Sequence, residues 1–134
     1  MIVCNSSRLA VGVDLATGET VWEAEAGGSS TPVATGEFLV VHAKDEKLGL
    51  AAYRWNGNGV DLAWKVPKLT RRSDSSPLVK DGQVYLFGAG MRACHDLRTG
   101  EKRWKEMAKH DISSPILNDF SKLTRSPLFE DLKL

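Results

Sequence analysis

Side chains able to ligate a metal or act as nucleophiles are few in this sequence and widely separated. The three histidines, His42, His95 and His110, lie 53 and 15 residues apart, which is no metal-ligand spacing. The two cysteines, Cys4 and Cys94, belong to no CxxC or CxxCH pattern and lie in strand-like stretches, where free cysteines are usually small core residues. We therefore predict no metal site and no catalytic residue, with both cysteines buried and His95 either exposed or a satisfied core residue.

Serine-rich segments lead into a proline three times, at residues 29–32, 75–77 and 113–115. None of them contains the Gly-x-Ser-x-Gly elbow of a serine nucleophile, so we do not expect them to be catalytic. A small basic stretch contains Lys65, Lys68, Arg71 and Arg72. Such a stretch can bind a phosphate or an acidic partner, or it can be a solvated loop. The sequence leaves both interpretations open.

The balance of charges excludes several classes of partner. Eighteen basic and seventeen acidic residues leave a formal net charge of +1, so no strong field attracts nucleic acid or an anionic membrane. The longest apolar runs, such as residues 38–41, are far too short to span a bilayer. Residues 1–5 lack the basic and apolar start of a secretory signal. We expect no nucleic-acid partner, no membrane insertion and no export signal in the chain as given.

A repeat organises the sequence. Trp22, Trp64 and Trp104 recur at separations of 42 and 40 residues. Residues 14–22 and 96–104 both read D-L-x-T-G-E-x-x-W, and a serine-rich proline segment follows each tryptophan about ten residues later. Self-similarity at such a period indicates a repeat architecture, in which each unit buries its apolar faces against its neighbours.

Each unit is predicted to contain four short strands and almost no helix. In the third unit the strands are expected at residues 75–80, 83–88, 91–97 and 102–106, and in the second at 30–35, 38–42, 50–55 and 62–66. Residues 83–88 are apolar at consecutive positions, which predicts burial on both faces. Four-stranded units at this period indicate an all-β fold, a β-propeller of radial blades. A β-sandwich stays as the alternative, although it would not require a tryptophan at a fixed place in each unit.

The predicted units do not make a closed ring. We expect a partial blade at residues 1–29, full blades at 30–74 and 75–112, and the first strand of a further blade at 113–117. Residues 118–134 fit no blade and form a tail of undetermined structure. Propellers close with roughly four to eight blades, so about three units form an open fragment. Such a fragment is expected to need the remaining blades of a longer chain, other subunits or copies of itself.

The repeated motif has a physical meaning of its own. Asp14 and Asp96 can accept hydrogen bonds from backbone N–H groups two or three residues on, and Gly18 and Gly100 can supply a positive φ for a bulged hairpin. Each tryptophan is then placed to lie on the adjacent blade, where burial of so large a ring contributes about 2–3 kcal/mol. The residues assigned to this structural motif are Asp14, Thr17, Gly18, Trp22, Trp64, Asp96, Thr99, Gly100 and Trp104.

The pattern A-x-D-x-x-T-G-x-x-x-W, followed by S-S-P, resembles the tryptophan-docking repeat of pyrroloquinoline-quinone-type (PQQ-type) propellers. The resemblance covers residues 1 to about 117, with Gly12 and Cys94 in the place of the leading alanine. The middle copy departs from it, because residues 51–59 contain no D-x-x-T-G before Trp64 and offer Asn-Gly steps for a longer hairpin instead.

The resemblance implies several functions. Its family includes quinone-dependent alcohol and sugar dehydrogenases, outer-membrane assembly lipoproteins and other bacterial envelope proteins. The dehydrogenases are marked by an adjacent cysteine pair, which is absent here, and Asp14 and Asp96 are already explained as turn acceptors. We therefore predict a non-catalytic scaffold or interaction surface in a bacterial cell-envelope protein, located in the periplasm or envelope and binding no cofactor. The alternatives are a segment of a dehydrogenase, which alone would require PQQ and calcium, and an outer-membrane assembly propeller.

Overall fold

Runs of β-branched and aromatic residues, punctuated by Gly, Asn and Asp, form short antiparallel strands in the computed structural model, which describes residues 1–70, 75–88 and 90–107. Three sheets contain all the strands of these residues, each in chain order. Blade 1 consists of β1 (Ile2–Asn5), β2 (Leu9–Val13) and β3 (Thr20–Glu25). Blade 2 consists of β4 (Val33–Thr35), β5 (Phe38–His42), β6 (Leu50–Trp55) and β7 (Val60–Val66). Blade 3 consists of β8 (Leu78–Lys80), β9 (Gln83–Gly88), β10 (Met91–Asp96) and β11 (Lys102–Met107).

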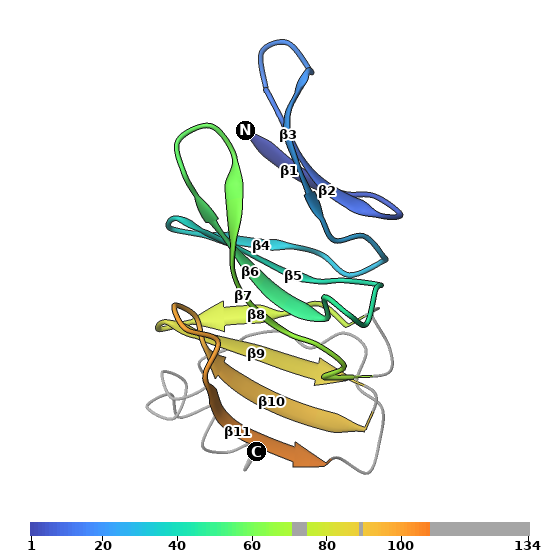
Figure 1. Ribbon diagram of the computed structural model, residues 1–134, viewed down its shortest axis with the longest axis vertical. Coiled ribbons are helices and arrows are strands. Elements are labelled where there is room, and N and C mark those ends of the chain that lie inside the picture. The colour runs from blue at the N-terminus through green and yellow to red at the C-terminus, as the bar shows by residue number, and fades with distance from the viewer. Residues whose placement is uncertain (71–74, 89, 108–134) are drawn as a thin grey trace, which may run out of the picture.

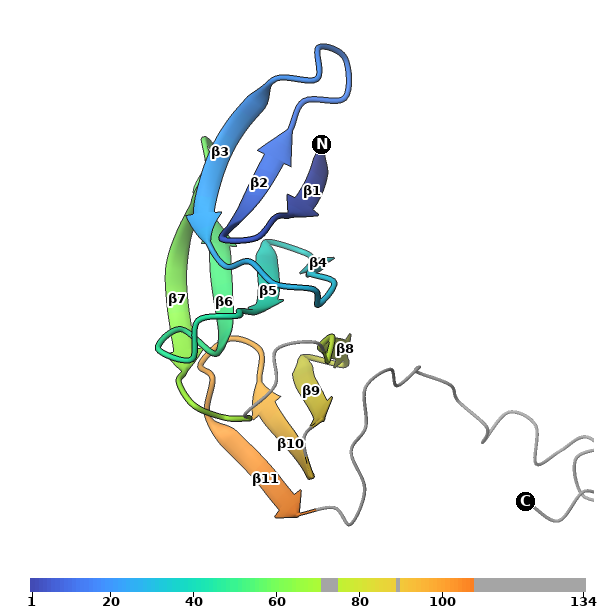
Figure 2. The ribbon, with the colours of Figure 1, turned by 90° about the vertical axis from the view of Figure 1, so that its right-hand side faces the viewer.

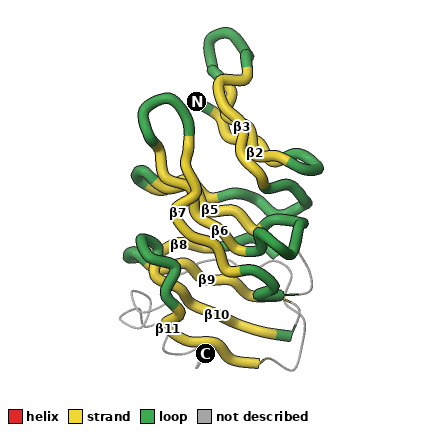
Figure 3. The backbone as a smooth tube through the Cα atoms, in the orientation of Figure 1, coloured by secondary structure: helices red, strands yellow, loops and turns green. Residues whose placement is uncertain are grey.

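The three blades follow one another along the long axis of the molecule (Figure 1). Figure 2 shows β3, β7 and β11 along one side, and β1, β4 and β8 along the other. Contacts between β3 and β7 and between β4 and β8 join like strands of neighbouring blades. Strands and loops account for the whole described chain in Figure 3, and no blade closes on another to complete a ring. The predicted all-β fold, an open propeller fragment, is confirmed.

Blade 2 is buried on both faces, since it lies between the other two. Leu39 and Val41 of β5 belong to the core shared with blade 1, whereas Phe38 and Val40 belong to the core shared with blade 3. Every residue of β5 is therefore buried. Two apolar cores, one at each blade junction, hold the fragment together.

Burial on both faces, predicted for residues 83–88, is wrong for β9. Val84 and Leu86 are fully buried against blade 2, but Tyr85 and Phe87 on the opposite face are only partly buried. The physical reason is that described residues cover only one face of blade 3.

The strand boundaries differ from the prediction where proline intervenes. The strands expected at residues 30–35 and 75–80 begin only at Val33 and Leu78, directly after Pro32 and Pro77. Proline has no N–H to donate, so the ladder starts after it. The strand expected at 113–117, the tail 118–134 and the end of the unit 75–112 lie outside the described residues, as do Arg71, Arg72 and His110.

Candidate functional site

The two Asp-x-x-Thr-Gly turns have the same hydrogen-bond pattern. In blade 1, Asp14 Oδ1 accepts from the N–H groups of Ala16 at 2.8 Å and Thr17 at 3.1 Å. The N–H of Gly18 donates to the Asp14 carbonyl at 2.9 Å, and Gly18 has a φ of 75°. Thr17 Oγ1 accepts from the Glu19 N–H at 3.2 Å. The turn therefore uses its polar side chains to fix its own backbone.

The turn of blade 3 repeats this arrangement and adds an ion pair. Asp96 Oδ1 accepts from the N–H groups of Arg98 at 2.9 Å and Thr99 at 3.0 Å. Arg103 donates to Asp96 Oδ2 at 2.8 Å. The Thr99 N–H, together with Arg103, lowers the pKa of Asp96, and the N–H groups of Ala16 and Thr17 lower that of Asp14. Both carboxylates are thus fixed as ionised acceptors, which makes them poor proton donors.

Trp64 crosses from blade 2 to the turn of blade 3. Its Nε1–H donates to the Leu97 carbonyl at 2.6 Å, and its side chain is 8% exposed. The ring lies so close to Gly100 that a Cβ there would be 2.6 Å from Cδ2 of the indole. Gly100 is therefore required twice, for its φ of 75° and for the space that the ring occupies.

Trp22 is buried in a different way. Its ring lies over Gly12, its cross-strand neighbour in β2, where a Cβ would be 2.2 Å from Nε1. The indole N–H donates to the Met1 sulfur at 3.0 Å. The hairpin of blade 2 ends in residues 56–59 and contains no Asp-x-x-Thr-Gly turn. The degenerate turn of the middle repeat therefore affects the surroundings of Trp22 in the preceding blade. Trp64, the tryptophan of the middle repeat itself, meets the complete turn of blade 3.

Trp104 occupies the same register position in blade 3 but is not covered. It pairs with Cys94, as Trp64 pairs with Ala52, and a bulge follows in each strand pair. Its side chain is 38% exposed, and its ring centroid lies 6.2 Å from that of Tyr85 and 6.5 Å from that of Phe87. The burial against an adjacent blade that the sequence predicts for Trp104 is therefore not observed, because no described sheet follows β11.

The serine-rich segments tie strands together near β4 and β8. The hydroxyl of Ser30 donates to the His42 carbonyl at 2.6 Å, and the hydroxyl of Ser75 donates to that of Phe87. Between the blades, His42 Nδ1–H donates to the Ser75 carbonyl at 2.8 Å, and the Thr31 N–H donates to Ser76 Oγ at 2.8 Å. The hydroxyls of Ser30, Ser75 and Ser76 therefore have partners within and between the blades.

The cysteines and His95 are placed as follows. Cys94 is buried and donates to Gln83 Oε1 at 2.9 Å, and burial raises the pKa of its thiol. Cys4 is exposed, so the expected burial is wrong; it lies on the face of β1 that no described sheet covers.

His95 is a core residue whose Nδ1–H donates to the Gly100 carbonyl at 3.0 Å. Its ring stacks on Trp64, and its buried Nε2 has no partner among the described residues.

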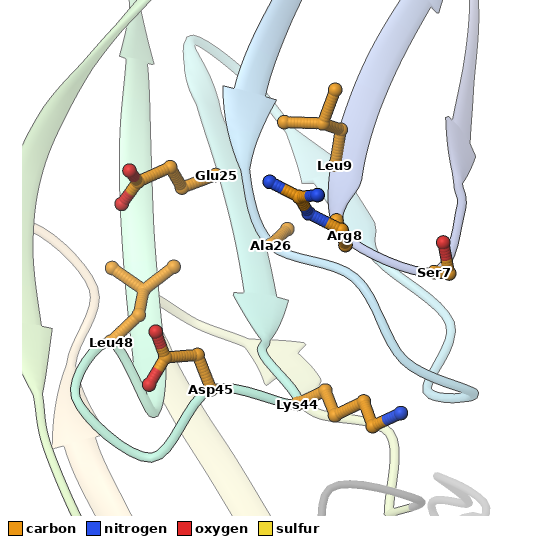
Figure 4. A pocket seen from close by; sticks show the side chains of 8 residues that line it. All are labelled: Ser7, Arg8, Leu9, Glu25, Ala26, Lys44, Asp45 and Leu48. Carbon is orange, nitrogen blue, oxygen red and sulfur yellow. The ribbon is translucent and has the colours of Figure 1, made fainter.

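A cleft at the junction of blades 1 and 2 is the candidate binding site. It has a volume of about 520 Å³ and opens between the β1–β2 turn, the end of β3 and the β5–β6 connection. Figure 4 shows the side chains of Glu25 and Arg8 above those of Leu48, Asp45 and Lys44. The lining residues are Ser7, Arg8, Leu9, Glu25, Ala26, Lys44, Asp45 and Leu48.

The charged residues of this cleft are open to solvent, and Asp45 Oδ1 accepts from the Lys47 N–H at 2.9 Å. Arg8, Glu25, Lys44 and Asp45 are exposed, and they form no ion pair within residues 1–70, 75–88 and 90–107. Sequence reasoning missed all four, because they come from two loops and the end of β3 and belong to no repeated motif. Of the basic stretch, Lys68 lines a smaller cleft of about 230 Å³ beside Met91 and Lys105.

A quinone–calcium centre finds no ready cluster of ligands among the described residues. Among them, no three His, Cys, Asp or Glu side chains lie close enough together to hold a metal ion. The two motif aspartates already accept backbone N–H groups. We therefore derive no redox step for this chain.

Comparisons with known proteins establish the family. A family model described as "Outer membrane protein assembly factor BamB" matches residues 1–131. The chain belongs to this BamB-like family of PQQ-type propellers. No curated protein matches it at the significance required.

Solved structures show the fold of the BamB-like chain. BamB from Moraxella catarrhalis matches with a TM-score of 0.64 and 24% identity, over 84% of this chain and 35% of that one. Quinohemoprotein alcohol dehydrogenase from Comamonas testosteroni matches with a TM-score of 0.61 and 17% identity, over 78% and 19%. Europium-containing methanol dehydrogenase matches with a TM-score of 0.55 and 14% identity, over 88% and 20%. The BamB-like chain thus spans about a third of BamB, or 35%, and at most 20% of these two dehydrogenases.

Within the described ranges, the BamB-like chain contains no helix long and apolar enough to cross a lipid bilayer.

Proposed function

We propose that this chain is a non-catalytic propeller segment that binds another protein in the bacterial cell envelope. The observation that carries the proposal is the charged cleft between blades 1 and 2. The description of the matched family favours outer-membrane protein assembly as the process in which such a scaffold takes part.

The chemistry of the cleft selects a polypeptide as its ligand. Two cations, Arg8 and Lys44, and two anions, Glu25 and Asp45, line the same opening. A nucleic acid or a polyanion would meet repulsion from the carboxylates, whereas a polypeptide segment that bears both charges can pair with each group. Leu9, which is partly buried, adds apolar surface to which such a segment can pack.

Hydrogen bonds across the junction of blades 1 and 2 support recognition of a specific partner. Tyr53 on β6 donates from its hydroxyl to the Glu25 carbonyl at 2.6 Å, which joins the two walls of the cleft. The Lys44 N–H donates to the Gly27 carbonyl at 2.9 Å across the same junction. A preformed cleft loses little conformational entropy when a ligand binds.

Site-specific crosslinking in the bacterial envelope tests this function. A photo-crosslinking amino acid at Ser7, on the rim of the cleft, is expected to give a discrete adduct with an envelope protein. The same probe at Asn58, on the exposed tip of the β6–β7 hairpin, is the positional control and is expected to give none.

A charge reversal separates recognition from general surface charge. The variant Arg8→Glu/Lys44→Glu is expected to lose the Ser7 adduct. The matched variant Lys65→Glu/Lys102→Glu makes the same change of net charge on exposed strand residues and is expected to retain it. Equal adducts at Ser7 and Asn58, or an adduct that survives reversal of the cleft charges, would contradict the proposed function.

A further inference from the structure

A second cleft lies at the junction of blades 2 and 3. It has a volume of about 580 Å³ and opens between the β4–β5, β8–β9 and β10–β11 turns. Both blades that border it are four-stranded sheets within the described residues. Its apolar lining residues, Phe38 and Leu97, are buried, so a ligand meets mainly polar and charged groups there.

This second cleft and the first cleft, between blades 1 and 2, open at opposite ends of the strands. The first is bordered by the β5–β6 connection and the second by the β4–β5 turn, and these two connections leave opposite ends of β5. In Figure 1 the β4–β5, β8–β9 and β10–β11 turns lie on the left, and the β1–β2 and β5–β6 connections lie on the right. The two clefts can therefore be occupied at the same time.

Backbone hydrogen bonds hold the walls of the second cleft. The Leu97 N–H donates to the Gly82 carbonyl at 2.9 Å, which ties the β10–β11 turn to the β8–β9 turn. The Trp55 N–H donates to the Glu37 carbonyl at 2.7 Å, which ties the β4–β5 turn to the end of β6. A backbone held in this way needs little ordering when a ligand binds.

Two carboxylates of the second cleft already have cationic partners. Arg103 donates to Asp96 Oδ2 at 2.8 Å, and Arg54 donates to Glu37 Oε1 at 2.9 Å. These pairs neutralise the acidic side chains of the β10–β11 and β4–β5 turns, so neither carboxylate is the main feature that a ligand meets.

One cation and one anion of the cleft are left over. Arg98 lies 4.0 Å from Glu37, which Arg54 already binds, and its side chain is 74% exposed. Asp81 is exposed and forms no ion pair with the described residues. Arg98 and Asp81 come from different turns of blade 3 and line the same opening.

We propose that the second cleft binds a polypeptide segment that carries both charges, with an acidic side chain at Arg98 and a basic side chain at Asp81. A guanidinium offers a planar set of donors that matches a carboxylate, and the Asp81 carboxylate accepts from a lysine or arginine. A purely anionic ligand is repelled by Asp81 and a purely cationic one by Arg98. With one cleft at each end of its strands, the chain holds two polypeptide segments at once. The second site stands on its own residues and does not depend on the function proposed for the first.

Amide NMR spectra of the ¹⁵N-labelled full chain, titrated with short unstructured peptides, test this site. The probe peptide alternates Lys and Glu between Gly and Ser spacers, and matched peptides of the same length carry only Lys or only Glu. The alternating peptide is expected to shift the signals of Gly82 and Arg98 saturably at about 1 mM, and the other two peptides are not. The signals of Ser7 and Lys44 report the first cleft in the same titration, so the failure of one site is distinguished from the failure of the other.

Neutral variants of the two unpaired residues test their roles. Asp81→Asn keeps a residue type that tolerates the φ of 52° found there, and Arg98→Gln removes the cation. Each is expected to weaken binding at the second cleft about three- to fivefold, as for the loss of one exposed ion pair, and both together about tenfold or more. The matched controls Glu19→Gln and Lys65→Gln make the same charge changes on exposed residues outside both clefts and are expected to bind like the unaltered chain.

Three results overturn the proposal. The first is that the signals of Gly82 and Arg98 do not move with the alternating peptide. The second is that the all-Glu or all-Lys peptide binds there equally well, which would make the cleft a simple anion or cation site. The third is that the cleft variants lose no more binding than the controls. Because Asp81 and Arg98 lie in different turns, a folding defect in one variant, seen by circular dichroism, leaves the other to decide.

Discussion

Replacement of Gly100 by alanine tests the contact between blades 2 and 3 most sharply. Two penalties combine at this position. A φ of 75° disfavours any residue with a Cβ by about 1–2 kcal/mol. The new methyl group would also lie 2.6 Å from Cδ2 of Trp64, and such overpacking costs about 1–3 kcal/mol. We expect Gly100→Ala to lower the free energy of unfolding by about 2–5 kcal/mol.

Gly82→Ala is the matched control. Gly82 has the same φ of 75°, but nothing lies within 4 Å of its Cβ position. It therefore reports the backbone penalty alone, about 1–2 kcal/mol. The difference between the two substitutions, measured by urea denaturation, isolates the collision with the indole.

A double-mutant cycle completes the test. In a Trp64→Leu background the ring is absent, so Gly100→Ala is expected to cost only as much as Gly82→Ala. The coupling between the two positions is then about 1–3 kcal/mol, the size of the removed collision. Equal losses for Gly100→Ala and Gly82→Ala in the unaltered background, or no coupling in the cycle, would refute the position assigned to Trp64.

Three further predictions concern the junctions and the chemistry. Tyr53→Phe removes the hydrogen bond to the Glu25 carbonyl and is expected to lower the free energy of unfolding by about 1 kcal/mol, as measured in urea; no change would show that the junction does not use this bond. The pKa of Asp96 lies below its ordinary value of 3.8, so its contribution to stability is complete above that value and is lost as the pH falls through the lower pKa of the folded state. The stability difference between the unaltered protein and Asp96→Asn should therefore shrink on acidification below about pH 4, and a constant difference from pH 7 to pH 2 would contradict it. Titration calorimetry with pyrroloquinoline quinone and calcium is expected to show no saturable heat, whereas a stoichiometric complex would restore the dehydrogenase interpretation.

Much of the fold was predictable because the local signals agree with one another. The Asp-Thr-Gly turns, the β-branched runs and the serine-proline segments each define a strand boundary within a few residues. The order of strands in blades 2 and 3 follows from hairpins too short to allow another pairing. The structural roles assigned to the motif residues stay predictions until the substitutions above are made.

The surroundings of individual side chains were less predictable. The sequence shows a complete motif before Trp22 and a degenerate one before Trp64, yet Trp64 is the ring that meets an Asp-Thr-Gly turn. The reason is that the ring of Trp64 reaches the turn of the following blade, whose Leu97 lies 33 residues further along the chain. Gly12, read only as a departure from alanine, leaves the space into which the ring of Trp22 folds.

The candidate site was not predictable for a related reason. Arg8 and Lys44 come from loops of two blades, Glu25 ends β3, and the three share no motif. Their proximity follows from how the blades pack, which hydrophobic periodicity does not encode. Cys4 was misjudged because an apolar run indicates a strand but does not show which of its faces is covered.

Hydrogen exchange of the indole N–H groups, followed by NMR on protein labelled with ¹⁵N-tryptophan, tests the central claim most directly. That claim is that Trp64 joins blade 2 to blade 3 through a buried hydrogen bond to the Leu97 carbonyl. The account predicts slow exchange at Trp64 and fast exchange at Trp55, which is 40% exposed. Exchange at Trp64 as fast as at Trp55 would contradict the account.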